Sequence, residues 1–417
     1  MNEFIKQKFE QIRRGEVPEG YKKTKLGVVP SEWEDTLFSD LFTSTSDYTD
    51  DLDRYPLYSL TIEDGITAKT ERYERSHLVK KENAYKIVLP NDFAYNPMNV
   101  RFGAVARHKG NNEISISGYY DIFTTKVASD LEFMDSFLIS DKMITYYNKV
   151  SIGSLVEKQR VHFTQFMDFR LPLPSESERK KIAEILSKQE KLIALKEKLI
   201  EEKKRQKKAL MQQLITGKKR LSGFNDKWEP TKLKKLLKER KTYSQKGLEY
   251  PHVTLSTEGI YAKTERYDRE HLVKSEDKEY KITHKGDICY NPANLKFGVI
   301  CVNTFGDAIF SPIYVTFEVQ EGVDLGFLSN YLMRWDFINA VRKYEEGTVY
   351  ERMAVKPEDF LRFEILLPPI EEQKAIADIL VTADKEIDLL KRDLDQEKQK
   401  KKALMQLLLT GIVRVTE

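Results

Sequence analysis

The chain has 417 residues, of which 32% are charged and 40% are hydrophobic, and its formal net charge is +3. This length allows two cores of ordinary size with connecting segments, and the composition is typical of a soluble protein with long exposed helices. The small net charge by itself indicates no strongly anionic partner, and no stretch reaches the roughly 18 apolar residues that a membrane span requires.

The first half of the chain predicts a globular domain behind a short leading segment. Residues 1–29 start with a charged amphipathic stretch, which predicts a helical segment; it lacks the apolar region of a secretory signal, so we expect a cytoplasmic protein. Residues 30–171 mix short apolar β-type runs, such as 58–62 and 85–88, with turn residues, and show helical periodicity around 131–148. They predict a mixed α/β domain with a curved sheet.

A long helix follows each globular region. After Pro174, and again after Pro369, about 40 residues without glycine or proline end at Gly217 and Gly411. Proline is tolerated at a helix start and glycine is favoured just past a helix end, so both boundaries have a physical cause. The predicted regions are a leading helical segment (1–29), a first globular domain (30–171), a central helical region (172–217), a second globular domain (218–367, with a β-type run at 309–315 and helical periodicity at 325–343) and a C-terminal helical region (368–417).

Both helical regions carry an apolar seam. Its residues alternate at spacings of four and three, and a seam with a period of 3.5 residues needs a partner helix. The simplest partner is the other helical region, packed antiparallel. The seam residues are Ile182, Leu186, Ile193, Ile200, Leu210 and Leu214 in the first region, and Ile376, Leu380, Ala383, Ile387, Leu390, Leu394, Leu404 and Leu408 in the second.

Much of the sequence occurs twice, at an offset of 194 or 195 residues. Residues 68–73 are identical to 262–267, and residues 208–212 are identical to 402–406. A period of this length predicts two whole domains. In the order of the repeat, the second helix ends where the N-terminal segment begins. We therefore expect a circular, pseudo-two-fold organisation in which the chain termini lie close together.

The two cysteines, Cys289 and Cys301, have no counterpart in the first copy, where Ala94 and Ala106 stand. A structural disulfide would be expected in both copies or in neither. We interpret both cysteines as reduced core residues of a cytosolic protein.

The sequence contains few of the patterns that indicate a catalytic site. The six histidines show no metal-ligand spacing, and no Gly-x4-Gly-Lys-Ser/Thr phosphate loop is present. Asn96-Pro97 and Asn291-Pro292 are similar to the start of the Asn-Pro-Pro-aromatic loop of amino-group methyltransferases, but the second proline and the aromatic residue are missing. We therefore expect a non-catalytic chain without a cofactor or metal of its own.

Two repeated polar segments in each copy predict recognition surfaces instead. Arg and Lys pair with guanine acceptors or phosphates, and Asn reads adenine bidentately. Glu71 either accepts from cytosine or orients Arg72, and His77 and His271 have a hydrogen-bonded structural role as the alternative. The candidate DNA-binding residues are Lys69, Thr70, Glu71, Arg72, Tyr73, Arg75, His77, Asn96, Asn99 and Arg101 in the first copy, and Lys263, Thr264, Glu265, Arg266, Tyr267, Arg269, His271, Asn291, Asn294 and Lys296 in the second.

Other conspicuous residues favour a structural interpretation. Tyr95, Pro97 and Phe102 are interpreted as core residues. The lysine-rich runs 203–208 and 398–402 are typical of a solvated coiled-coil surface, with contact to DNA phosphates or to a partner subunit as the alternative.

The whole pattern resembles the specificity subunits of type I restriction-modification systems. The most specific motifs are the boundary segments 359–373 and 168–176 and the paired Lys-Ala-Leu-Met-Gln…Leu-x-Thr-Gly helix ends. The first copy differs mildly from the family pattern, because it has Ser177-Glu178-Arg179 where residues 371–373 of the second copy are Glu-Glu-Gln.

The resemblance implies a function and partners. Two target-recognition domains would each bind one half of a bipartite double-stranded DNA sequence, and the helices would separate them and dock two methyltransferase subunits. Restriction and translocase subunits would join the full complex in a bacterial or archaeal cytoplasm. The resemblance also implies that S-adenosylmethionine, ATP and Mg²⁺ are bound by the partner chains.

The length of the helices agrees with a bipartite target. About 40 helical residues at roughly 1.5 Å each give about 60 Å, the length of on the order of 17 base pairs. If residues 68–80 and 262–274 contact bases, the two half-sites should be closely related and the target a gapped near-palindrome. The alternatives are a structural adaptor whose coiled coil joins two protein-binding domains, and a fused single-chain enzyme, which the missing catalytic motifs disfavour.

Overall fold

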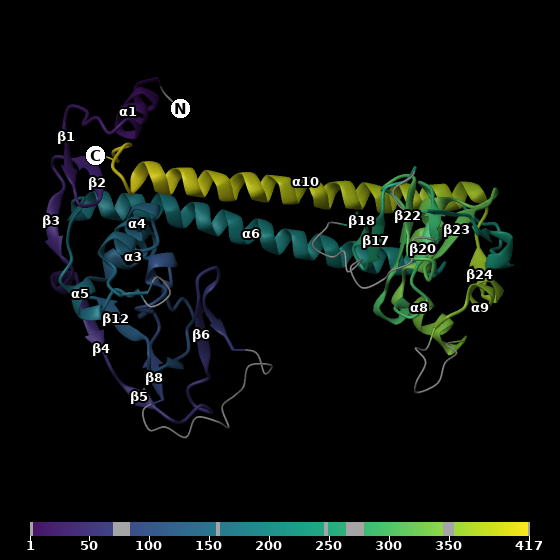
Figure 1. Cartoon of the computed structure of the whole chain (residues 1–417), viewed down its shortest axis with the longest axis horizontal. Coiled ribbons are helices and arrows are strands. Elements are labelled where there is room, and N and C mark those ends of the chain that lie inside the picture. The colour runs from purple at the N-terminus through teal and green to yellow at the C-terminus, as the bar shows by residue number, and fades with distance from the viewer. Residues whose placement is uncertain are drawn as a thin grey trace. The chain divides into compact units, whose positions relative to one another are not determined.

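The computed structural model describes residues 3–69, 84–155, 159–245, 249–263, 279–344 and 354–415. The chain forms two compact units, Met1–Glu197 with Asp393–Glu417 as unit 1 and Lys198–Arg392 as unit 2. The long helices α6 (Glu176–Ile215) and α10 (Ile370–Leu408) each contribute one part to each unit (Figure 1).

Apart from the long helices, each unit is built from short strands and short helices. Unit 1 contains α1 (Glu3–Arg13), β1 (Tyr21–Thr24), β2 (Gly27–Pro30), β3 (Glu34–Leu37), α2 (Phe38–Leu41), β4 (Phe42–Thr45), β5 (Tyr48–Thr49), β6 (Tyr58–Thr61), β7 (Gly65–Ala68), β8 (Tyr85–Val88), β9 (Phe93–Tyr95), η3 (Val100–Phe102), β10 (Val105–Arg107), β11 (Ile114–Ser117), β12 (Asp121–Thr125), η4 (Ala128–Asp130), α3 (Leu131–Phe137), α4 (Asp141–Val150), α5 (Phe163–Met167) and β13 (Arg170–Leu173). Unit 2 contains β14 (Glu229–Lys232), η6 (Leu233–Lys235), β15 (Leu237–Glu239), β16 (Tyr243–Gln245), β17 (Val253–Ser256), β18 (Gly259–Ala262), β19 (Glu279–Thr283), β20 (Ile288–Tyr290), η9 (Leu295–Phe297), β21 (Ile300–Val302), β22 (Ala308–Phe310), β23 (Val315–Val319), α7 (Leu325–Leu332), α8 (Trp335–Val341), η10 (Arg342–Tyr344), α9 (Pro357–Arg362) and β24 (Glu364–Leu367).

The two units share one sheet topology, which confirms the predicted pair of similar mixed domains. A four-stranded sheet has the order β10-β9-β12-β4 in unit 1 and β21-β20-β23-β15 in unit 2. A three-stranded sheet has the order β11-β8-β5 or β22-β19-β16. The pairs β6-β7 and β3-β13 of unit 1 recur as β17-β18 and β14-β24, and all these ladders are antiparallel.

The predicted helical stretches of the globular domains are each interrupted. The stretch 131–148 is divided between α3 and α4, because Ser140 is the N-cap of α4 and its hydroxyl accepts from the backbone N–H of Met143 at 3.4 Å. The stretch 325–343 similarly contains α7 and α8, and Asp324 caps α7. The β-type run 309–315 is likewise divided between β22 and β23 by a turn.

The leading segment is helical only at its start. The helix α1 ends at Arg13, and residues 21–30 form the hairpin β1–β2 instead of the predicted helix. Gly15 and Gly20 both have positive φ values, which end the helix and turn the chain into the hairpin.

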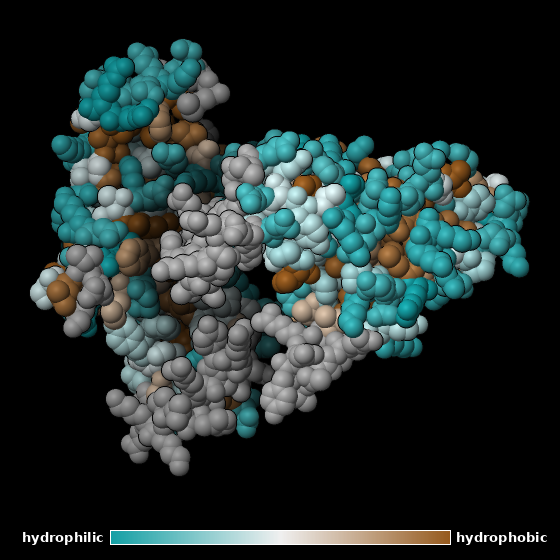
Figure 2. Space-filling view, turned by 45° about the vertical axis from the view of Figure 1, so that its right-hand side comes forward, coloured by the Kyte–Doolittle hydropathy of each residue, from teal (hydrophilic) through white to brown (hydrophobic). Residues whose placement is uncertain are grey.

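Each unit has an apolar core with the same central tyrosine. Tyr95 in unit 1 and Tyr290 in unit 2 are fully buried, and each hydroxyl donates to a backbone carbonyl, that of Val161 at 2.9 Å or Val355 at 3.0 Å. Tyr95 is therefore a core residue, as predicted. The face of the molecule in Figure 2 is mostly hydrophilic, with apolar side chains in small separate patches.

The long helices pair antiparallel within each unit. In unit 1, Lys196 Nζ lies 2.6 Å from Asp393 Oδ2, and this hydrogen bond raises the pKa of Lys196. In unit 2, Lys203 and Lys207 contact Glu386 and Asp384 at 2.5 Å. The predicted seam is the buried face of both helices, with Ile182, Leu186, Ile193, Ile200, Leu214, Ile376, Leu380, Ile387 and Leu408 buried and Ala383, Leu390, Leu394, Leu404 and Leu210 partly buried.

The two ends of the chain meet in unit 1. Tyr21 donates its hydroxyl hydrogen to the carbonyl of Gly411 at 2.8 Å. A Cβ atom at Gly411 would clash with Pro30 and Trp33, so only glycine fits against this part of the N-terminal segment. These contacts confirm the predicted circular organisation.

Candidate nucleic-acid interface

Twelve of the twenty candidate DNA-binding residues lie outside the described residues. They are Thr70, Glu71, Arg72, Tyr73, Arg75 and His77 in the first copy, and Thr264, Glu265, Arg266, Tyr267, Arg269 and His271 in the second. For these residues a role in DNA binding stays a prediction.

A tight hairpin leads into each of these segments. In β6–β7 the hydroxyl of Thr61 accepts from the N–H of Asp64 at 3.0 Å and donates to the carbonyl of Gly65 at 3.2 Å. In β17–β18 the hydroxyl of Ser256 makes the matching bonds to residues 258 and 259. The two repeated segments therefore begin from equivalent structures.

The described start of each repeated segment is fixed in the same way. The N–H of Lys69 donates to the carbonyl of Leu57 at 3.2 Å, and the N–H of Lys263 donates to the carbonyl of His252 at 3.0 Å. The two lysines occupy matching positions at the end of β7 and of β18.

In the second predicted cluster, two asparagines stabilise turns. Asn96 is buried, and its side-chain oxygen accepts from the N–H groups of Met98 and Asn99 at 3.1 and 3.3 Å. Asn291 is also buried and accepts from the N–H of Ala293 at 3.1 Å. Side chains held in this way favour a structural role over base contact.

The remaining residues of this cluster differ in exposure. Asn99 is exposed, and Asn294 and Lys296 are partly exposed. Arg101 is only 8% exposed, and its Nη1 donates to the side-chain oxygen of Gln159 at 3.0 Å. The guanidinium of Arg101 is therefore held inside the domain, which favours a role in positioning its neighbours.

Phe102 corrects one sequence interpretation. Its ring is 48% exposed, and the ring of Phe297 at the matching position is 60% exposed, so neither is a core residue. The following glycines, Gly103 and Gly298, have φ values of 99° and 79° and end the short turns η3 and η9. This turn points the phenylalanine outward, and an exposed aromatic residue is a contact candidate that hydrophobicity alone does not reveal.

A groove lies beside the hairpin β6–β7 in unit 1. Its volume is about 660 Å³, and its walls come from the β6–β7 turn, the Phe102 loop, β10, the α3–α4 region and the long helices. The lining includes Tyr58, residues 61–66, residues 102–103, residues 105–110, Asp135, Ile139, Ile144, Glu190 and Lys401.

Three cations and two carboxylates form a chain of ion pairs in this groove. Lys109 Nζ lies 2.8 Å from Asp135 and 3.1 Å from Glu190, and Lys401 reaches Glu190 at 3.3 Å. Arg107 contacts Asp135 at 3.5 Å. Burial by itself raises the pKa of Glu190, but the two lysines lower it below its usual value.

Unit 2 has only part of this series of ion pairs. Lys207 and Asp384 stand where unit 1 has Lys401 and Glu190, and they contact each other at 2.5 Å. Thr304 stands where unit 1 has Lys109. A threonine cannot form the ion pairs by which Lys109 links the globular domain of unit 1 to the long helices.

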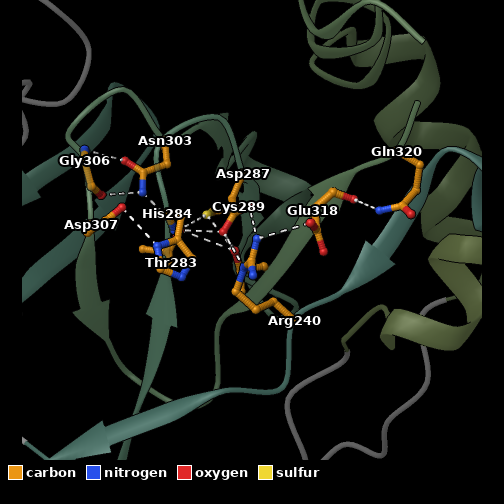
Figure 3. Close-up of polar contacts among 11 residues, drawn as sticks. Arg240, Thr283, His284, Asp287, Cys289, Asn303, Gly306, Asp307, Glu318 and Gln320 are labelled. Carbon is orange, nitrogen blue, oxygen red and sulfur yellow. Dashed lines mark hydrogen bonds and ion pairs between the residues drawn. The ribbon is translucent and has the colours of Figure 1, made fainter. Parts of the chain in front are cut away.

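Unit 2 instead contains a buried polar network between its sheets (Figure 3). Arg240 donates to both carboxylate oxygens of Asp287 at 3.0 and 3.1 Å, and this pairing raises the pKa of Arg240. The hydroxyl of Thr283 lies 3.2 Å from the Cys289 sulfur and accepts from Asn303 at 3.0 Å.

The network provides internal structure and no reactive group. Cys289 and Cys301 are buried, free thiols, as predicted for core residues. Burial raises the pKa of Cys289 to about 12 and that of Cys301 to about 11, so both remain protonated and weakly nucleophilic.

Two other kinds of feature are absent from the described part of the chain. Within it, no cluster of three His, Cys, Asp or Glu side chains is arranged to hold a metal ion. Among the helices described, none combines the length and apolarity that crossing a membrane requires.

Comparison with known proteins identifies similar sequences. The pattern of the Type I restriction modification DNA specificity domain matches residues 225–398. A Methanocaldococcus jannaschii protein, named as the specificity subunit of type I restriction enzyme MjaX, is 26% identical over 95% of this chain and 97% of its own length. The MjaVIII specificity subunit of the same organism is 27% identical over 60% of this chain and 63% of its own length.

Solved structures show the same fold at lower identity. The S subunit of a type I restriction-modification system from M. genitalium has a TM-score of 0.51 at 12% identity, covering 90% of this chain and 96% of that one. A chain from a study of complex assembly and conformational transition in the type I R-M system has a TM-score of 0.53 at 14% identity, covering 95% and 100%.

Proposed function

We propose that this chain, which belongs to the specificity-subunit family of type I restriction-modification systems, reads a bipartite DNA target with one domain for each half. The observation that carries the proposal is the duplication of the site. The two domains have the same topology, and in each an identical polar segment starts at the end of an equivalent hairpin. A pair of like recognition surfaces is what a bipartite sequence requires.

The identity of the repeated segments extends the proposal to the target itself. Residues 68–73 and 262–267 have the same sequence, so the same side chains are available to both half-sites. The two half-sites are therefore closely related, and the target is a near-palindrome with a gap.

The long helices set the gap and dock the methyltransferase subunits in this proposal. Leu192, Leu195 and Leu199 are exposed on α6 at spacings of three and four, which places them on one face of the helix. Leu195 is 65% exposed. An apolar stripe outside the paired seam fits a helix of a partner subunit.

The chemistry belongs to the partner chains in this proposal. S-adenosylmethionine, ATP and Mg²⁺ bind to two methyltransferase subunits and to restriction and translocase subunits, in the cytoplasm of the host cell. The asparagines of the two Asn-Pro motifs support this division, because the side chains of Asn96 and Asn291 are occupied as turn caps. The present chain supplies recognition and is not itself catalytic.

Methylation sequencing of the host genome, with and without this gene, tests the function. The expected result is a gapped methylated motif with related halves that disappears with the gene. Unrelated halves would contradict the near-palindrome, and an unchanged methylation pattern would contradict the function. An adaptor of protein-binding domains is distinguished by salt titration of duplex binding, since phosphate contacts predict a steep loss of affinity between 50 and 200 mM salt, on the order of a thousand-fold.

A further inference from the structure

Two exposed phenylalanines occupy the same loop position in the two units. Phe102 and Phe297 lie in the matching sequences Asn-Val-Arg-Phe-Gly and Asn-Leu-Lys-Phe-Gly. Both rings remain largely exposed and forgo the stabilisation that burial of an aromatic side chain gives. A single exposed apolar residue needs no explanation, but the same residue exposed twice points to a shared task.

Several interior residues differ between the two domains, whereas the exposed phenylalanine is the same in both. Apolar residues between the sheets of unit 1 are replaced by the polar network of unit 2 (Figure 3). The replacements are Thr283 for Val88, Cys289 for Ala94 and Thr316 for Ile122. Packing constrains buried positions more than exposed ones. Shared folding requirements therefore do not account for the repeated exposed ring.

Each ring has one face covered by a cation. The Arg101 guanidinium lies 4.4 Å from the ring centre of Phe102, and the Lys296 ammonium lies 5.3 Å from that of Phe297. The pairing is favourable and fixes the ring. With one face covered, the ring has its other face and its edge left for a ligand. This arrangement does not suit insertion between two base pairs, but it suits contact with a single base.

The ring of unit 1 lies in the groove beside the hairpin β6–β7. Phe102 and residues 61–66 of the hairpin β6–β7 line the same groove. The hairpin is close to β10, because a Cβ atom at Gly65 would lie 3.1 Å from that of Ala106. The same hairpin leads into Lys69, the second residue of the segment 68–73 that both copies share. In unit 2, β18 contacts β21 in the same way.

We propose that Phe102 and Phe297 each press the free part of the ring against the 5-methyl group of a thymine in the major groove, one in each half-site. The inference rests on the proposed DNA recognition and adds an apolar contact to it. Aromatic contact with the thymine methyl is an established means of direct readout.

The test uses the complex of this chain with its methyltransferase subunits and duplexes carrying the target motif. Affinity is measured for Phe102→Ala and Phe297→Ala, on the natural duplex and on duplexes with uracil in place of thymine in one half-site. Wild type should lose roughly ten-fold in affinity when the contacted thymine becomes uracil. Phe102→Ala should show the same loss on the natural duplex and no further loss with uracil in its own half-site.

Matched controls separate this contact from general effects. Tyr119 is 48% exposed and Ile313 is 64% exposed, and they occupy the turns before β12 and β23. Tyr119→Ala and Ile313→Ala should bind as wild type does, and Phe102→Leu should keep most of the affinity. If wild type binds its target specifically and both Phe→Ala variants bind equally well, or if uracil costs the variants as much as wild type, the proposal is wrong. Absence of specific binding by wild type would instead overturn the proposed function.

Discussion

Arg414 and Glu178 form a bidentate ion pair, with nitrogen–oxygen distances of 2.8 and 3.0 Å. Arg220 and Glu372 form the same pair at 2.7 and 2.8 Å. In unit 1 the arginine follows α10 and the glutamate belongs to α6, whereas in unit 2 the arginine follows α6 and the glutamate belongs to α10. The repeat is therefore closed circularly by equivalent contacts at both helix ends.

Removal of Arg220 should destabilise the protein more than removal of an exposed cation. The side chain of Glu372 is fully buried, and among the described residues only the indole N–H of Trp228, at 2.9 Å, would still donate to it without Arg220. We expect Arg220→Ala to reduce the free energy of unfolding by about 2–4 kcal/mol, measured by urea denaturation. Lys391→Ala, which removes an exposed pair with Asp388, should cost less than about 0.5 kcal/mol. Equal costs for the two variants would show that the buried pair does not stabilise the fold.

Arg179 should not be replaceable by the glutamine of the other copy. Arg179 binds both oxygens of the buried Asp130 at 2.7 and 3.1 Å. Gln373, at the matching position, instead accepts from the N–H of Asp324 and donates to the carbonyl of Pro368. Arg179→Gln leaves Asp130 without its counter-ion, and we expect a loss of about 2–4 kcal/mol in unfolding free energy.

The double variant checks the cause of that loss. Asp130→Asn removes the carboxylate, so combining it with Arg179→Gln should recover part of the stability. If the two substitutions are simply additive, the ion pair is not the reason for the difference between the copies.

The helices and the repeat could be predicted from the sequence because both signals are local and long. Proline before the helix and glycine after it placed α6 and α10 to within a few residues, and the seam spacing identified the buried face. The pairing of short strands depends on distant contacts. The sequence therefore indicated strands at β6 and β8, but not which strands they pair with.

Site residues were harder to predict because exposure is a tertiary property. The sequence predicts Asn96 and Arg101 as polar recognition residues, yet both side chains are buried and form hydrogen bonds within the domain. Phe102 read as a core residue, yet the left-handed Gly103 turns it outward. In the sequence, the feature that indicates the outward position of this ring is the glycine directly after the phenylalanine in both copies.

Stability should rise with pH through the titration of Lys142. Burial lowers the pKa of Lys142 to about 8, although its ammonium group donates to the carbonyl of Val28. Below pH 8 the lysine is charged in both states, and the cost of burying that charge is fully present. Between pH 8 and its unfolded pKa of about 10.4, the unfolded state binds more protons, so the folded state becomes relatively more stable.

Lys142→Met should remove this dependence. Unfolding free energies measured from pH 7 to 10 should rise by at most about 3 kcal/mol more in wild type than in Lys142→Met. The neighbouring Lys149→Met, on the same helix α4, is the control and should keep the wild-type slope. A wild-type slope in Lys142→Met would assign the effect to another group.

Arg72 and Arg266 should act on separate half-sites. They occupy matching positions in the repeated segments, one in each domain. We expect Arg72→Ala to relax base preference in one half of the target and Arg266→Ala in the other, each by about 1–3 kcal/mol for the base concerned. Methylation sequencing of cells carrying each variant measures this, and equal relaxation of both halves by one variant would contradict independent domains.

Lengthening one long helix should change the gap and leave the half-sites unchanged. Four residues inserted after Glu197 add about 6 Å of helix, close to two base pairs, and about 40° of rotation beyond a full turn. The insertion lies between Lys196, which contacts Asp393, and Lys203, which contacts Glu386. Because α10 keeps its length, the pairing on one side of the insertion must move by about one helical turn along α10. Methylation sequencing should show the original half-sites separated by a different number of bases. Because the gap in this proposal comes from the helices and the base preferences come from the domains, altered half-sites at an unchanged gap would refute the division of roles.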